Sequence, residues 1–213
     1  MQRAAVTSHE CGGASYKNVF IDYADWPTVK DTKSFGKVPN LVIVDESDGS
    51  RKELFEVGAI DAYLAETFDL MPGPTPFDRA EALSVLSALY DLQNKIIPAY
   101  FFPTLHERKT AHEKHIAETI PTYLKYHERF VRGETYYFGD KMTVADLKLY
   151  QMYLWFEDIY LEKNPLRTHA AAFPKLTRII DSLAKGKAGD YARNRRDFGR
   201  YKWSLEEWKW IFH

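Results

Sequence analysis

Cysteine and long apolar runs are scarce in this chain, and each absence excludes a class of protein. The 213 residues contain one cysteine, Cys11, so no internal disulfide framework can form. No apolar run approaches the ~18 residues that a transmembrane helix requires. The first residues, MQRAAVTSHECGG, lack the apolar core of a secretory signal. We therefore expect a cytoplasmic protein that does not span a membrane.

A surplus of charge of one sign is also lacking. Lysine and arginine total 29 and aspartate and glutamate 30, which gives a net charge of -1. Proteins that bind nucleic acid or a membrane surface present a basic face, so we expect neither as a partner. Hydrophobic residues make up 45% of the chain, which is enough for a core in one large domain or two small ones.

The first third of the chain contains short strand patterns and one helix pattern. Alternating apolar residues predict a strand over residues 16–23, and an apolar run predicts a buried strand over residues 41–44. An Asp-Gly turn at 48–49 then predicts an antiparallel neighbour over residues 53–55. From Gly58 the apolar residues recur at helical spacing.

The remainder of the chain has only helical patterns. Three prolines and a glycine in residues 71–76 predict a linker between residues 1–70 and an all-helical domain of residues 77–213. The expected helices cover 78–97, 107–132 with a bend at Pro121, 143–160 as the most buried helix, and one that opens at Pro174. Thr143 and Asp146 have the spacing of a capping box. Strands followed by helices indicate an α+β chain of two domains.

Two segments resemble the glutathione S-transferase family. They are KVPNLVI with ELFEVGAIDAYLAE, in the first domain, and GDKMTVADL, before the expected central helix. The resemblance is to cytosolic members of the sigma, pi and mu kind, with a shortened or altered N-terminus. It implies a thioredoxin-like N-terminal domain, truncated here, followed by an all-α helical bundle. It also implies glutathione as the ligand or co-substrate, and no metal.

The resemblance implies that backbone atoms bind much of the glutathione. The bond between Val38 and Pro39 should be cis, so that the main chain of Val38 pairs with the cysteine of the ligand. Glu56 and Val57 open the following helix, where the family binds the γ-glutamyl carboxylate with a hydroxyl and N–H groups. Val57 replaces that hydroxyl, so we expect weakened binding.

Three further residues are implied as ligands through their charge or indole group. Trp26 and Lys30 correspond to residues that hold the glycyl carboxylate, and Lys37 precedes Val38 where relatives often have glutamine. In the helical domain, four aromatic residues are candidates for an apolar pocket that takes the second substrate. They are Tyr90, Tyr100, Phe101 and Phe102.

The catalytic residue that would activate the thiol cannot be assigned. Family enzymes place a tyrosine, serine or cysteine at the end of a first strand, but only 15 residues precede Tyr16. A strand, a helix and their connections need about 20 or more residues. Ser8 and Cys11 are the only hydroxyl or thiol candidates near that position, and both are weak ones.

Several functions fit this sequence. The leading hypothesis is a glutathione S-transferase that binds glutathione weakly and conjugates it to small hydrophobic electrophiles, as a homodimer. The alternative is a catalytically silent module for protein assembly or ligand carriage, and a glutathione-dependent isomerase is a third reading. His106, His112 and His115 do not form an H-E-x-x-H motif. We expect them on a solvated helix face rather than in a metal site.

Overall fold

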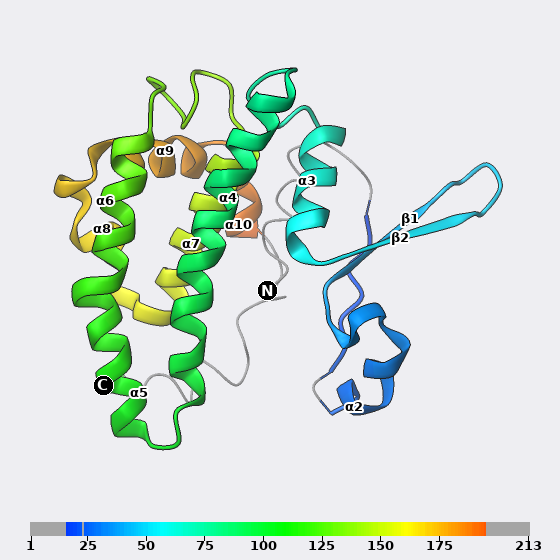
Figure 1. The fold of residues 1–213 in the computed structure, drawn as a ribbon, viewed down its shortest axis with the longest axis horizontal. Coiled ribbons are helices and arrows are strands. Elements are labelled where there is room, and N and C mark those ends of the chain that lie inside the picture. Colours follow the sequence, from blue (N-terminus) through cyan, green and yellow to red (C-terminus); the bar gives the residue numbers. More distant parts are fainter. Residues whose placement is uncertain (1–15, 23, 195–213) are drawn as a thin grey trace. The chain divides into compact units, whose positions relative to one another are not determined.

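The structure is a computed structural model that describes residues 16–22 and 24–194, in two compact units (Figure 1). The first unit is Met1–Leu70 and the second is Met71–His213. A small strand-containing part followed by a helical part is the α+β class that the sequence predicts.

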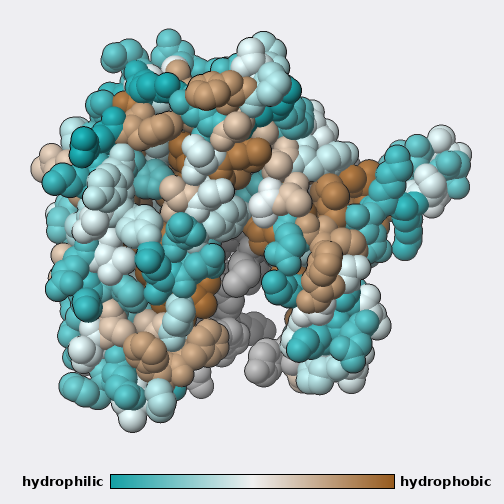
Figure 2. Space-filling view, viewed as in Figure 1, coloured by the Kyte–Doolittle hydropathy of each residue, from teal (hydrophilic) through white to brown (hydrophobic). Residues whose placement is uncertain are grey.

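The first unit contains one antiparallel hairpin. Strand β1 (Asn40–Val44) pairs with β2 (Arg51–Phe55), with Asn40 opposite Phe55 and Val44 opposite Arg51. The turn between them closes through the Asp45 N–H, which donates to Ser50 O at 2.9 Å, while Gly49 takes the positive φ of 71° that glycine tolerates. Both predicted strands are confirmed. Figure 2 shows hydrophilic residues at the tip of this hairpin.

The predicted strand over residues 16–23 is wrong for the part that is described, since residues 16–22 belong to no strand. The alternating pattern is present, but Val19 is 71% exposed and Phe20 48% exposed. A strand forms only where a neighbour accepts its backbone hydrogen bonds, and within the described residues β1 and β2 pair only with each other.

Short helices and one longer helix flank this hairpin. α2 (Trp26–Val29), η1 (Lys30–Thr32) and η2 (Ser34–Gly36) precede β1. α3 (Val57–Thr67) follows β2 and contacts both strands. Its buried side chains recur at helical spacing, as the sequence predicts; they are Ile60, Asp61, Leu64 and Ala65.

The second unit is built from helices around one central member. α7 (Val144–Tyr160) packs against α4 (Pro76–Ile96) and α9 (Pro174–Lys185), and most of its residues are buried. This confirms the prediction that it is the most buried helix. The other elements are η3 (Ile97–Phe101), α5 (Leu105–Lys114), η4 (His115–Thr119), α6 (Ile120–Phe130), η5 (Leu161–Lys163), α8 (Pro165–Thr168), η6 (Ala170–Ala172) and α10 (Lys187–Asn194).

The long helix predicted over 107–132 is interrupted just before Pro121. Residues His115–Thr119 form a π-turn, in which the Ile120 N–H donates to His115 O. Proline has no N–H and its ring clashes with the carbonyl of the preceding turn. The wider π-turn relieves both problems, which explains why the interruption falls at this position.

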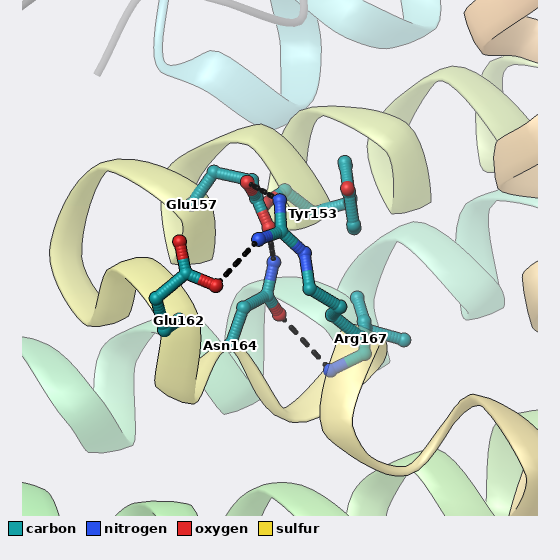
Figure 3. Close-up of polar contacts among 6 residues, drawn as sticks. Tyr153, Glu157, Glu162, Asn164 and Arg167 are labelled. Carbon is teal, nitrogen blue, oxygen red and sulfur yellow. Dashed lines mark hydrogen bonds and ion pairs between the residues drawn. The ribbon is translucent and has the colours of Figure 1, made fainter.

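A polar network closes the connection after α7. Figure 3 shows Asn164 and Arg167 both reaching the Glu157 carboxylate, with Glu162 beside Arg167. Asn164 is fully buried; its Nδ2 donates to Glu157 Oε1 at 2.6 Å, and its Oδ1 accepts from the Leu166 N–H at 3.0 Å. One side chain therefore caps α8 and also ties it to α7.

We expect Asn164→Ala to lower the free energy of unfolding by about 2–3 kcal/mol, because it removes the cap of α8 and one of the donors to the half-buried Glu157 carboxylate. Urea denaturation followed by circular dichroism measures this change. The exposed Asn94 of α4 provides the matched control, Asn94→Ala, for which we expect a change within about 0.5 kcal/mol. Equal effects of the two substitutions would contradict a stabilising role for the network.

Candidate functional site

The register of the hairpin brings two predicted ligand segments together. Asn40 lies opposite Phe55, so Pro39 and Val38, just before β1, lie next to Glu56, just after β2. The Val38–Pro39 peptide bond is cis, as the resemblance implies. Pro39 is buried, whereas Val38 is 38% exposed. The main chain at Val38 and the start of α3 therefore face one shared region of the first unit.

An ion pair links the two segments. Lys37 Nζ donates to Glu56 Oε1 at 3.3 Å, across the gap between the chain entering β1 and the chain leaving β2. The side chains are 69% and 53% exposed, so water screens the pair. Two residues that the sequence predicts as separate ligands are thus in direct contact.

The N-terminus of α3 is the second element of this region. Glu56 is its N-cap residue, with φ 64° and ψ 127°, a conformation that residues other than glycine rarely adopt. Its side chain makes no capping bond, and the first helical bond runs from the Ile60 N–H to Glu56 O. The N–H groups of the first turn, from Val57 to Ala59, have no acceptor within the helix. Such a terminus favours negative charge.

Trp26 and Lys30 lie on the same side of the short helical segment before the hairpin. The Lys30 N–H donates to Trp26 O, so the two residues are one helical turn apart. The Lys30 side chain also lies against Gly36, where an added Cβ would be 3.4 Å from Lys30 Cε. Because Gly36 immediately precedes Lys37, this contact places Lys30 beside the segment that enters β1.

The predicted aromatic residues of the second unit have different surroundings. Tyr90 lies beneath the ammonium of Lys148, whose Nζ is 3.9 Å from the ring centroid. Lys148 is 2% exposed and donates to Gln93 Oε1 at 3.1 Å and Gln151 Oε1 at 2.9 Å. Sequence reasoning missed this polar cluster, although a lysine within so apolar a helix was a visible signal.

Tyr100 packs against a buried histidine. Its ring is 4.6 Å from that of His112, edge to face, and His112 Nδ1 lies 3.2 Å from the Tyr160 hydroxyl. The prediction that His112 lies on a solvated face is wrong, because its side chain is fully buried, with Tyr100 of η3 and Tyr160 of α7 against it. Burial lowers the pKa of His112 to about 4, so it is neutral at pH 7. His106 is exposed and His115 half-buried.

Phe101 and Phe102 are at the surface, 75% and 40% exposed, in the connection between α4 and α5. Figure 2 shows apolar side chains gathered at the lower end of the helical unit, where this connection lies.

The two weak candidates for the catalytic residue, Ser8 and Cys11, fall outside the described residues. No group of three or more potential metal ligands occurs in the described part of the chain. Within the same residues, no helix is both long and apolar enough to cross a membrane.

Comparison with known proteins identifies a domain of the second unit. Residues 90–188 match the model of the glutathione S-transferase C-terminal domain. The second unit therefore contains a glutathione S-transferase C-terminal domain. The chain is 30% identical over 138 residues to hematopoietic prostaglandin D synthase of Gallus gallus, a match that covers 63% of each protein. It is also 27% identical over 177 residues to glutathione S-transferase S1 of Drosophila melanogaster, across 81% of this chain and 65% of that one.

Solved structures of the family have the same fold. A sigma class glutathione transferase of Fasciola hepatica superposes with a TM-score of 0.76 over 92% of this chain and 93% of its own, at 23% identity. Rat hematopoietic prostaglandin D synthase superposes with a TM-score of 0.74 at 20% identity, over 92% and 93%. The predicted thioredoxin-like and all-helical architecture is therefore confirmed.

Proposed function

We propose that the first unit binds glutathione, weakly, in the region between Val38 and the N-terminus of α3. The supporting observation is the register of the hairpin, which places Val38 next to Glu56. An extended peptide that pairs with the main chain at Val38 gains affinity without any particular side chain. The comparisons add that this chain is similar to proteins named for glutathione transfer.

Each predicted ligand has a role in this proposal. The Val38 N–H and C=O pair with the cysteinyl residue, and the first turn of α3 donates to the γ-glutamyl carboxylate. Glu56 accepts from the ligand's ammonium. Lys30 and Lys37, with the indole N–H of Trp26, attract the glycyl carboxylate at the other end.

We propose conjugation to small apolar electrophiles as the reaction. The thiol releases its proton to solvent, the sulfur forms a bond to the electrophilic carbon, and the leaving group departs with the bonding electrons. The aromatic residues Tyr90, Tyr100, Phe101 and Phe102 stay the candidates for contact with the electrophile. Homodimer formation and a cytoplasmic location also stay predictions, and light scattering checks the first.

A catalytically silent module is the second candidate, and Val57 favours it. A methyl group at this position cannot donate to the γ-glutamyl carboxylate, although the N–H groups of α3 remain. Calorimetry with millimolar glutathione separates the candidates: we expect heat of binding and a thermal shift. The absence of both heat of binding and a thermal shift would contradict the proposed function.

We expect Val57→Ser to tighten glutathione binding by about ten-fold or more, because a hydrogen bond to a charged group is worth ~1.5–3 kcal/mol. Val44, which is 49% exposed in β1, provides the control substitution Val44→Ser, which should leave the affinity unchanged. Isothermal titration measures both. If Val57→Ser has no effect, the carboxylate does not bind at the N-terminus of α3.

A further inference from the structure

We propose that Ser34 is a phosphorylation site for a protein kinase that selects basic sequences, and that its phosphate reduces glutathione binding by pairing with Lys30 and Lys37. The regulatory part of this inference rests on the proposed function, because it concerns the lysines that attract the glycyl carboxylate. The modification itself rests only on the segment KDTKSFGK, which runs from Lys30 to Lys37.

The first argument is that the Ser34 hydroxyl is accessible. Ser34 is exposed, and its hydroxyl forms no hydrogen bond to a described residue. The hydroxyls of Thr28 and Thr32, earlier in the same segment, each donate to the backbone carbonyl three residues before them, at 2.7 and 2.6 Å. Ser34 therefore has the hydroxyl of this segment that is free to accept a phosphoryl group.

The second argument is the irregular backbone around Ser34. Lys33 is extended, with φ -101° and ψ 132°, whereas Phe35 and Gly36 are left-handed, with φ 61° and 57°. Ser34 opens η2, a 3-10 turn of three residues between these conformations. No long helix has to unfold for such a segment to enter the substrate cleft of a kinase.

The third argument is the charge pattern around Ser34. Lys30 and Lys33 precede it by four residues and by one residue, and Lys37 follows it by three. Phe35, directly after it, is 74% exposed. Kinases distinguish their substrates by the charges that flank the acceptor. Lysines on both sides, with an exposed aromatic residue next to the acceptor, fit a kinase whose cleft is acidic.

The transfer requires only ATP as the second substrate. The Ser34 oxygen bonds to the γ-phosphorus of ATP, the bond between that phosphorus and the bridging oxygen breaks, and ADP leaves with the bonding electrons. The hydroxyl proton passes to the catalytic aspartate of the kinase and from there to solvent. The modified side chain carries a charge of about -1.5 to -2 at pH 7.

The new phosphate would lie among cations that the proposed function assigns to glutathione. Lys30 lies against Gly36, where an added Cβ would be 3.4 Å from Lys30 Cε, so it folds back along the segment that contains Ser34. Lys37 is 69% exposed and pairs with Glu56 in water, so its ammonium can turn to the phosphate at little cost. The phosphate therefore occupies both lysines and also repels the anionic ligand.

Kinase treatment of the full-length protein tests the modification site. After incubation with the catalytic fragment of protein kinase C and MgATP, we expect tandem mass spectrometry to find phosphate at Ser34. Ser34→Ala should remove this uptake. Ser47→Ala is the matched control, because Ser47 is an exposed serine whose hydroxyl donates to Asp45 Oδ1 at 2.6 Å; it should take up as much phosphate as the unmodified protein. Phosphate at other residues and none at Ser34 would overturn the proposal.

Isothermal titration with glutathione tests the effect of the phosphate. We expect the phosphorylated protein to bind about five-fold more weakly than the untreated protein, and kinase-treated Ser34→Ala to bind as the untreated protein does. In about 1 M sodium chloride, where charges are screened beyond about 3 Å, the difference should shrink to about two-fold or less.

An unchanged affinity after phosphorylation, or a loss that persists in high salt, would overturn the regulatory role of the phosphate while leaving the proposed function intact. If the untreated protein does not bind glutathione, the proposed function is wrong and the regulatory role fails with it. The mass spectrum decides the modification site in either case.

Discussion

Asp146→Ala is expected to lower the free energy of unfolding by about 4 kcal/mol, because it leaves several buried donors without an acceptor. Asp146 is fully buried at the start of α7. Its Oδ2 accepts from the Thr143 N–H and the Thr143 hydroxyl, both at 2.7 Å, and its Oδ1 accepts from the Tyr137 N–H at 2.8 Å. Each buried donor left unpaired costs about 1–3 kcal/mol.

The loss would be large because the carboxylate joins three segments. Tyr137 belongs to the loop before α7, and its hydroxyl lies 3.0 Å from Nδ1 of His127 on α6. Removal of Asp146 therefore weakens both the cap of the central helix and the attachment of the loop to α6. Typical stabilities are about 5–15 kcal/mol, so a loss of this size removes a large fraction of the total.

Urea denaturation monitored by far-UV circular dichroism measures the effect. Asp91→Ala is the matched control, because Asp91 is an exposed aspartate on α4 of the same unit. We expect its change to stay within about 0.5 kcal/mol. A similar, small loss in both variants would mean that the capping box contributes little to the stability of this protein.

The helices and the hairpin were predictable because their signals are local. Thr143 and Asp146 have the spacing of a capping box, and the structure forms it. The Asp-Gly turn at 48–49 predicts the hairpin from local sequence alone, and β1 pairs with β2 as expected. The interruption near Pro121 is also predictable from local sequence, because the missing proline N–H removes a hydrogen bond within the same helix.

The failures concern contacts between distant parts of the chain. The pattern in residues 16–22 resembles a strand, but a strand also requires a partner, which periodicity does not report. The solvated face predicted for His112 is wrong, because Tyr100 and Tyr160 come from other elements to cover it. In the candidate site, the residue types were predictable. The Lys37–Glu56 pair was not, since it depends on the register of β1 against β2.

Acidification from pH 7 to pH 4 is expected to destabilise the helical unit by about 3 kcal/mol, through two buried histidines. Burial lowers the pKa of His112 and of His127 from 6.5 to about 4. The unfolded chain therefore binds more protons than the folded one between these values, and stability is lost as the pH falls from about 6.5 to about 4. Each shift corresponds to about 3 kcal/mol.

Asp146 changes the stability in the opposite direction over an overlapping range of pH. Burial raises its pKa from 3.8 to about 6, against the hydrogen bonds from Thr143 and Tyr137, which favour the charged form. The folded state thus takes up this proton first, so stability rises by about 3 kcal/mol as the pH falls from about 6 to about 4. The gain in stability from Asp146 offsets the loss from one of the two histidines. The net loss of stability between pH 7 and pH 4 therefore equals the loss from the other histidine.

This balance makes one substitution decisive. His127→Gln keeps a hydrogen-bonding partner for the Tyr137 hydroxyl but cannot titrate, so its unfolding free energy should change by less than about 1 kcal/mol between pH 7 and pH 4. His106→Gln is the control, since His106 is exposed on α5; it should keep the full loss of the unmodified protein. Urea titrations at the two pH values measure all three proteins. A full acid loss in His127→Gln would show that His127 is already charged in the folded state, and that burial does not keep it neutral.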